Sequence, residues 1–166
     1  MQFIEYNLIS SILIRAPVSV IWREITNVDL RQVSHPLIFK ILGVPKPLRA
    51  EIEAEGVGGK RIAFFDNGKS FLQEIVDWAP NKSYGFVFSP EPGFRAGHIF
   101  DLSKGPFRIL SGYYSLEAVP NGISLILQSS YSVGGRMRFL LAKPIRLVLV
   151  AFQRFLLKSI KRNCER

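Results

Sequence analysis

The sequence predicts an α+β fold in which a curved antiparallel sheet wraps around a long C-terminal helix. Two patterns lead to this prediction. Residues 50–134 alternate apolar and polar side chains with a period of two and are divided by short turns, which is typical of an antiparallel meander. The last 30 or so residues change to helical period, and the helix they predict is apolar around much of its circumference. A helix of this kind is normally enclosed on most sides by other structure.

Composition sets the size and class of the protein. The chain has 166 residues, of which 48% are hydrophobic, and it includes 13 phenylalanines. We therefore expect residues 1–166 to form a single domain with a substantial core rather than a disordered chain. The lone cysteine, Cys164, excludes an internal disulfide and a cysteine-based metal site. Residues 1–5 show no basic leader, so we expect a cytoplasmic protein without a signal peptide.

A strand and short helices are expected before the meander. Residues 7–16 are rich in β-branched and apolar types, which predicts a strand that ends at Pro17. Residues 27–29 are suited to cap a second short helix, and the prolines that follow them break anything long. Between these segments, an amphipathic helix is predicted over residues 17–26, with apolar positions at Val18, Ile21, Trp22 and Ile25.

The meander itself divides at its turns. Asn67-Gly68 is the strongest hairpin signal in the chain, because both residues tolerate positive φ. Glu74 and Trp78 are expected to share one face of their strand. The predicted strands are an edge strand around 51–55, then 60–66, 69–78, 84–89 and 98–102, and two long strands at 107–119 and 123–133.

The terminal helix presents a broad apolar stripe. Polar and proline residues interrupt it, so it contains no run near the ~20 apolar residues that a membrane span needs. The stripe consists of Ile145, Val148, Leu149, Phe152, Phe155, Leu156 and Ile160, widened by Leu147, Val150 and Leu157.

The basic charge is concentrated in the same helix. The formal net charge is +9, and residues 136–166 hold nine Lys or Arg against Glu165 alone. A solvated helix face is the simplest interpretation, since a helix C-terminus favours cations. The alternative is contact with an anionic membrane surface or another phosphate-bearing partner. Nucleic acid is an unlikely partner, because no stacking platform or groove-reading motif accompanies the charge.

Several local patterns carry a resemblance to a known superfamily. Residues 11–25 run from a strand into Ala-Pro and then into a helix that carries Val-x-Trp. Gly59-Lys60-Arg61, residues 74–80 (Glu-Ile-Val-Asp-Trp-Ala-Pro) and the closing helix at 156–162 add to it. Together they resemble the START-like (SRPBCC) superfamily, which contains polyketide cyclases/dehydrases and lipid-transport proteins.

The resemblance implies a helix-grip fold with two short helices after the first strand. It also implies a cavity between the sheet and the terminal helix that holds a hydrophobic ligand. Members include lipid carriers, quinone-binding proteins and aromatic cyclases. Neither a metal nor an organic cofactor is implied, and we expect none.

Strand alternation selects candidate cavity residues. Tyr114 and Tyr131 fall on the faces we predict to point inward, where each could orient a ligand carbonyl or hydroxyl or else serve as a core residue bonded to backbone. Gly112 shares the inward face, where it leaves space. Arg61 is either an anchor for a carboxylate or phenolate or an exposed strand arginine. Arg61 and Phe64 lie on opposite faces of a regular strand, so only one of them can line the cavity. The predicted ligand-binding residues are Arg61, Phe64, Phe71, Phe86, Tyr114, Leu125, Tyr131, Phe152 and Leu156.

Three functions remain open at this point. The leading hypothesis is binding or transport of a lipid, a quinone or a polyketide-like aromatic, because an apolar pocket needs few polar contacts to bind. The second is a cofactor-independent cyclase or dehydratase whose catalytic candidates are Tyr114 and His98, the latter placed at the cavity mouth as donor or general base. The third is a peripheral membrane-surface protein that uses its basic C-terminal helix. We expect a binding protein rather than an enzyme.

Overall fold

The computed structural model describes residues 2–136 and 138–166, and it has the predicted α+β architecture. The elements follow the expected order, with two short helices after the first strand, then the remaining strands, and one long helix at the end. The elements are β1 (Phe3–Ile14), α1 (Val18–Thr26), α2 (Leu37–Leu42), β2 (Pro47–Ile52), β3 (Lys60–Phe65), β4 (Ser70–Ala79), β5 (Ser83–Pro90), β6 (Arg95–Ala96), β7 (Phe100–Asp101), β8 (Phe107–Val119), β9 (Gly122–Gly134) and α3 (Arg138–Cys164).

Seven strands form one curved antiparallel sheet in the order β1-β9-β8-β5-β4-β3-β2. Consecutive strands are neighbours from β2 to β5 because each is joined to the next by a short turn. Gly68 in the β3–β4 turn has φ 76°, as the Asn67-Gly68 prediction requires. The predicted edge strand exists as β2, although it begins at Pro47 and ends at Ile52 rather than near Glu55.

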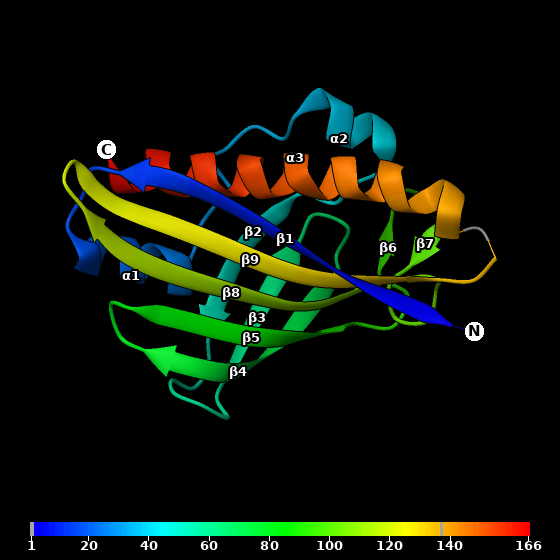
Figure 1. The fold of residues 1–166 in the computed structure, drawn as a ribbon, viewed down its shortest axis with the longest axis horizontal. Helices are drawn as coiled ribbons and strands as arrows, with labels where there is room; N and C mark the ends of the chain where they lie inside the picture. The colour runs from blue at the N-terminus through cyan, green and yellow to red at the C-terminus, as the bar shows by residue number, and fades with distance from the viewer. Residues whose placement is uncertain (1, 137) are drawn as a thin grey trace.

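Helix α3 packs against β1, β9 and α1. Figure 1 shows it running along the long strands β1 and β9, while β2 and β3 cross the molecule at a steep angle to them. Ile145, Leu157 and Ile160 are buried, in agreement with the predicted stripe. The prediction is wrong for Leu147, which is 72% exposed, because the sheet encloses only one side of this part of the helix.

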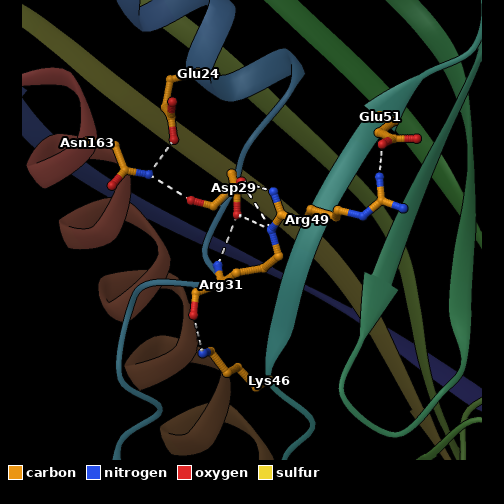
Figure 2. Close-up of polar contacts among 7 residues, drawn as sticks. All are labelled: Glu24, Asp29, Arg31, Lys46, Arg49, Glu51 and Asn163. Carbon is orange, nitrogen blue, oxygen red and sulfur yellow. Dashed lines mark hydrogen bonds and ion pairs between the residues drawn. The ribbon is translucent and has the colours of Figure 1, made fainter.

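A polar network fixes the C-terminal end of α3 (Figure 2). Asn163 Nδ2 donates to Glu24 Oε1 in α1 at 2.6 Å and to the Asp29 carbonyl oxygen at 2.9 Å. Asp29 in turn accepts hydrogen bonds from the Arg31 guanidinium, and Lys46 Nζ donates to the Arg31 carbonyl oxygen at 3.3 Å. One helix end thereby holds α1 and the segment that follows it.

The second short helix lies later than predicted. Residues 27–29 do not cap a helix, and Asp29 instead forms an isolated bridge with Arg49 of β2. Helix α2 starts after Pro36, whose fixed φ of −56° suits a helix entry. Its Phe39 is buried and packs against Phe152 and Phe155 of α3, which holds α2 on the terminal helix.

Two further strand predictions need correction. The strand expected at 98–102 is replaced by a small separate hairpin of β6 and β7. The pairing of β4 with β5 shifts register between Ile75 and Asp77. This bulge turns Trp78 onto Trp22 and Tyr84 in the core, whereas Glu74 stays exposed, so these two residues do not share a face.

Candidate ligand-binding cavity

A cavity of about 370 Å³ lies between the sheet and α3. Strands from the middle of the sequence, β3, β4, β5, β8 and β9, form one side of the cavity, and the terminal helix α3 closes the other. Most of the lining is aliphatic or aromatic. An apolar molecule that enters it leaves water without having to satisfy many polar groups. Representative lining residues are Phe71, Phe86, Phe94, Leu127, Val148 and Phe152.

Arg61 is the one buried cation in the described lining of this cavity, with 4% of its surface exposed. Its Nε and Nη2 donate to the carbonyl oxygens of Thr26 and Ile25 at 2.9 and 2.8 Å, which are the last residues of α1. Its Nη1 donates to Gln73 Oε1 at 2.9 Å. A cation at this position is favoured by the negative end of the α1 dipole.

The Arg61 guanidinium is not neutralised by a carboxylate among the described residues. Its partners are two backbone carbonyls and an amide, and the aromatic rings of Tyr84 and Phe86 lie 5.7 and 5.9 Å from its central carbon. A guanidinium has five N–H donors, and these contacts use three of them. The structure therefore excludes the exposed-arginine interpretation and leaves a donor-rich cation in the wall of an apolar cavity.

Two tyrosines lie beside this cation. Tyr114 lines the cavity, and burial raises the pKa of its phenol to about 12. Tyr84 stacks parallel to it with ring centroids 6.3 Å apart, and burial also raises its pKa, while Arg61 opposes the rise. Both phenols stay protonated at neutral pH, so Tyr114 offers the cavity a hydrogen-bond donor rather than a base.

A second polar group of residues lies where α3 meets β1 and β9. Gln153 Oε1 accepts a hydrogen bond from Ser10 Oγ at 2.7 Å, and Gln153 Nε2 donates to Ser129 Oγ at 2.9 Å. Ser130 Oγ lies 2.5 Å from Ser111 Oγ. These groups satisfy one another, so they bind α3 to the sheet. The lining also contains Arg49, but Arg49 is half-buried and paired with Glu51, so Arg61 is the buried charged group of the lining.

The structure brings most of the predicted ligand residues together. Phe64 does not line the cavity, because it lies on the other face of β3 beneath the Arg49 guanidinium, 4.5 Å from its ring centroid. Leu125 is fully buried but contributes to the core rather than to the lining. The predicted residues found in the lining are Arg61, Phe71, Phe86, Tyr114, Tyr131, Phe152 and Leu156.

The expected role of Gly112 is only partly realised. Gly112 lines the cavity, but a Cβ there would approach the Phe86 ring to 2.7 Å. The space that this glycine leaves is therefore occupied mainly by the Phe86 ring rather than by the void.

The histidines lie outside the cavity lining. His98 is exposed, has φ 64°, and its Nε2 lies 3.2 Å from the Ile41 carbonyl oxygen. Its ring covers Gly43, where a Cβ would lie 2.6 Å from the ring. His35 is buried, with Nε2 2.7 Å from the Val44 carbonyl oxygen. Both rings thus contact the segment around α2 rather than a ligand site.

Sequence reasoning missed several lining residues. Gln73 lies on the same face of β4 as Phe71 and Ile75, and that face is buried. The alternation of the sequence therefore contained a signal for Gln73. Phe94 and Leu102 lie beside two-residue strands whose pairing no periodic pattern reveals. Within the described residues no cluster of His, Cys, Asp and Glu suited to a metal ion is found.

Three lining residues are exposed to solvent and mark the mouth of the cavity. They are Leu42 at the end of α2, Ile99 between β6 and β7, and Pro144 in α3. The β6–β7 turn is held against α2, because the Gly97 amide donates to the Gly43 carbonyl oxygen at 3.0 Å. In the described parts of the chain, no helix combines the length and the hydropathy needed to cross a membrane.

Comparison with known proteins places the fold. Neither a protein-family model nor a curated protein matches the sequence. Among solved structures, an uncharacterized protein from Rhizobium leguminosarum aligns with a TM-score of 0.62 at 16% identity, over 99% of this chain and 97% of that one. Ara h 8.0201 aligns with a TM-score of 0.59 at 15% identity, over 95% of each chain.

A biosynthetic protein is similar over one part of its length. The di-domain ARO/CYC protein BexL of the BE-7585A pathway aligns with a TM-score of 0.60 at 11% identity, over 98% of this chain and 50% of BexL. Identities this low carry the fold and not the activity. With its curved seven-stranded sheet, two short helices and long terminal helix, the chain has a helix-grip fold, which these solved structures share.

Proposed function

We propose that the protein binds a compact apolar molecule that carries one anionic or strongly accepting oxygen group. The apolar body lies between the sheet and α3, and the oxygen group lies at Arg61. The observation that carries this proposal is a guanidinium, 4% exposed and without a carboxylate partner among the described residues, in the wall of a mostly apolar cavity. A buried cation is costly unless it is paired, so a ligand that supplies an anion is favoured there.

The size and lining of the cavity support a compact ligand. Ligand pockets typically enclose about 300–1,000 Å³, and this cavity of about 370 Å³ lies near the lower bound. A quinone or a polycyclic aromatic suits this volume better than a two-chain lipid. Burial of apolar surface is worth about 25 cal/mol per Å², so the hydrophobic walls supply most of the affinity. Arg61 and the Tyr114 hydroxyl then select the polar end.

Binding is favoured over catalysis by the protonation states of the polar lining. Burial raises the Tyr114 pKa to about 12, so its phenol keeps its proton at neutral pH, and the Arg61 guanidinium offers only N–H donors. Such groups orient and stabilise a ligand oxygen but do not abstract a proton. The imidazole proposed as a base, His98, lies outside the lining.

A pair of fluorescent probes tests the proposal. Anilinonaphthalene sulfonate and phenylnaphthylamine share fused aromatic rings, but only the first is anionic. Wild type should bind both saturably, with the anionic probe tighter. Arg61→Met should weaken the sulfonate probe at least about tenfold, as the loss of a charged hydrogen-bond partner predicts, and leave the neutral probe within about threefold. Equal loss of both probes would show that Arg61 has only a structural role.

Matched tryptophan variants locate the probes. Val148 lines the cavity, whereas Ala151 lies one turn further along α3 on its exposed side. Val148→Trp should fill the cavity and abolish binding of both probes, and Ala151→Trp should bind them as wild type does. Retained binding in Val148→Trp would place the probes elsewhere and contradict the proposal.

A further inference from the structure

The mouth of the cavity is surrounded by exposed apolar side chains. Leu140 and Leu147 precede and follow Pro144 by four and three positions, so they flank this mouth residue on the same helix face. Helix α2 turns Phe39 onto α3 and leaves its other apolar side chains in solvent. The apolar mouth surface comprises Leu37, Ile38, Ile41, Ile99, Phe139, Leu140 and Leu147, with exposed fractions from 55% to 78%.

These residues belong to elements that lie together. Phe39 packs on α3, and His98 and Gly97 contact the C-terminal end of α2, as described above. Figure 1 shows α2 on the side of α3 away from the sheet, with β6 and β7 near the N-terminal end of the same helix. Exposed apolar side chains gathered on neighbouring elements normally mark an interaction site.

Basic side chains accompany this surface. Lys143 and Arg146 are exposed on α3 between Leu140 and Leu147, and Lys40 lies between Ile38 and Ile41 on α2. Lys40 and Arg95 also line an open groove beside the mouth. Helix α3 has no Asp or Glu along its length.

The nearest carboxylates are already engaged. Asp66 in the same groove accepts a hydrogen bond from the Lys46 amide, and Asp101 of β7 accepts from the amide and hydroxyl of Ser103. Arg146 Nη1 donates to the Asn7 carbonyl oxygen at 3.5 Å, and among the described residues Lys40, Lys143 and Arg146 form no ion pair, so their charges can meet an external anion.

We propose that the mouth surface docks on an anionic lipid bilayer, with its apolar side chains among the acyl chains and its basic side chains at the headgroups. This inference rests on the proposed function, because a compact apolar ligand dissolves in a bilayer far better than in water. Apolar side chains flanked by Lys and Arg are the pattern that binds a membrane interface. Two copies of this surface would instead bring like charges together, which disfavours self-association through it.

The proposal places the contact at the mouth rather than along the whole basic helix. Lys158 and Arg162 are exposed nearer the C-terminal end of α3, away from the mouth residues Leu42, Ile99 and Pro144. They therefore provide charge controls on the same helix.

Flotation with vesicles of phosphatidylcholine, with and without phosphatidylserine, tests the proposal on the full chain. Wild type should float with the phosphatidylserine vesicles and lose that binding between ~0.1 and ~1 M salt, where the screening length falls from about 10 to 3 Å. Lys143→Glu with Arg146→Glu should reduce binding at least about twentyfold, since each basic residue near such a surface contributes about fivefold. Lys158→Glu with Arg162→Glu should reduce vesicle binding by a factor severalfold smaller than Lys143→Glu with Arg146→Glu does.

Apolar variants test which elements face the lipid. Leu140→Gln with Leu147→Gln, and Ile38→Gln with Ile41→Gln, should each lower vesicle binding at least about tenfold. The matched control is Ile9→Gln with Val57→Gln, two residues of similar exposure on β1 and in the β2–β3 turn, and it should bind as wild type does. Circular dichroism melts confirm that all of these surface variants stay folded.

Several outcomes would overturn the docking proposal. One is wild type that floats with neither kind of vesicle. Another is unchanged vesicle binding in the Ile38→Gln, Ile41→Gln variant. A third is a loss of vesicle binding in the Ile9→Gln, Val57→Gln control as large as in the mouth variants. A wild-type dimer that the Leu140 and Leu147 pair converts into a monomer would also overturn it. Val148→Trp keeps the mouth surface intact, so it should lose probe binding and retain vesicle binding. This separates failure of the docking proposal from failure of the proposed function.

Discussion

Replacing Arg61 with Met tests how the cavity wall is held. Met keeps an unbranched apolar stem and removes the three donated hydrogen bonds to Thr26, Ile25 and Gln73. Ile25 and Thr26 are buried, so their carbonyls gain little from water in the variant. Each acceptor left unpaired costs about 1–3 kcal/mol, which gives a gross loss of about 3–9 kcal/mol. Relief from burying an unpaired cation returns several kcal/mol, so we expect a net loss of about 2–4 kcal/mol.

Guanidinium chloride unfolding measures this loss. The Arg61→Met midpoint should fall while the slope with denaturant stays unchanged. Arg108→Met is the matched control, because Arg108 is an exposed strand arginine whose guanidinium lies 4.5 Å from the Phe3 ring centroid. That contact is worth about 0.5–1 kcal/mol. If Arg61→Met costs no more than Arg108→Met, the structural argument for a buried, carbonyl-bound guanidinium is wrong.

Three further perturbations follow from the same structure. Burial raises the pKa of Glu24 above its ordinary 4.5, so the native state binds the Glu24 proton more tightly than the unfolded chain does. Wild type therefore loses stability as pH rises from about 4.5 to the native-state pKa of Glu24. Glu24→Gln should remove this loss and match the stability of wild type at lower pH. Urea unfolding that gives both proteins the same pH dependence of stability would contradict the prediction. Burial raises the Tyr114 pKa to about 12, so the tyrosinate absorbance of wild type minus Tyr114→Phe should rise near pH 12, with stability lost between about 10 and 12; a rise near 10 would refute it. Gln153→Leu should cost about 1–3 kcal/mol in thermal unfolding, because it strips partners from Ser10 and Ser129, and a loss below about 0.5 kcal/mol would count against this network.

The sequence predicts the sheet best where alternation is long and the turn is specific. The strand at 107–119 has the predicted bounds, and the turn at Pro120-Asn121-Gly122 leads into β9 where expected. Lys60–Phe65 is recovered to within one residue. Over much of β8 a buried face alternates with a more exposed one, so the local pattern already contains part of the tertiary information.

Segments that depend on distant contacts are predicted less well. The bulge in β4 after Ile75 reverses the face of Trp78, and no residue type in β4 announces that shift. The start of α2 depends on Phe39 packing against α3, more than 100 positions away along the sequence. Likewise, helical periodicity counts Leu147 with the buried stripe because it does not show how far the sheet reaches around α3.

The candidate site shows the same division. Alternation in the two long strands places Tyr114 and Tyr131 on inward faces, and the structure agrees, whereas alternation in the strand of Phe71 does not decide which face points inward. Whether Arg61 or Phe64 faces the cavity could not be decided from β3 alone. The answer depends on the last carbonyls of α1, which lie 35 and 36 positions before Arg61 and receive its guanidinium. A side chain that acts across two elements is not defined by its own strand.

Methyl NMR with the sulfonate probe tests the central claim most directly, which is that an apolar ligand lies between the sheet and α3. The probe should give saturable shifts and intermolecular contacts at the methyls of cavity residues, such as Leu127, Val148 and Leu156, and none at exposed Ile9 and Val76. A saturated probe whose contacts fell only on exposed methyls, with those of the lining unmoved, would contradict the account.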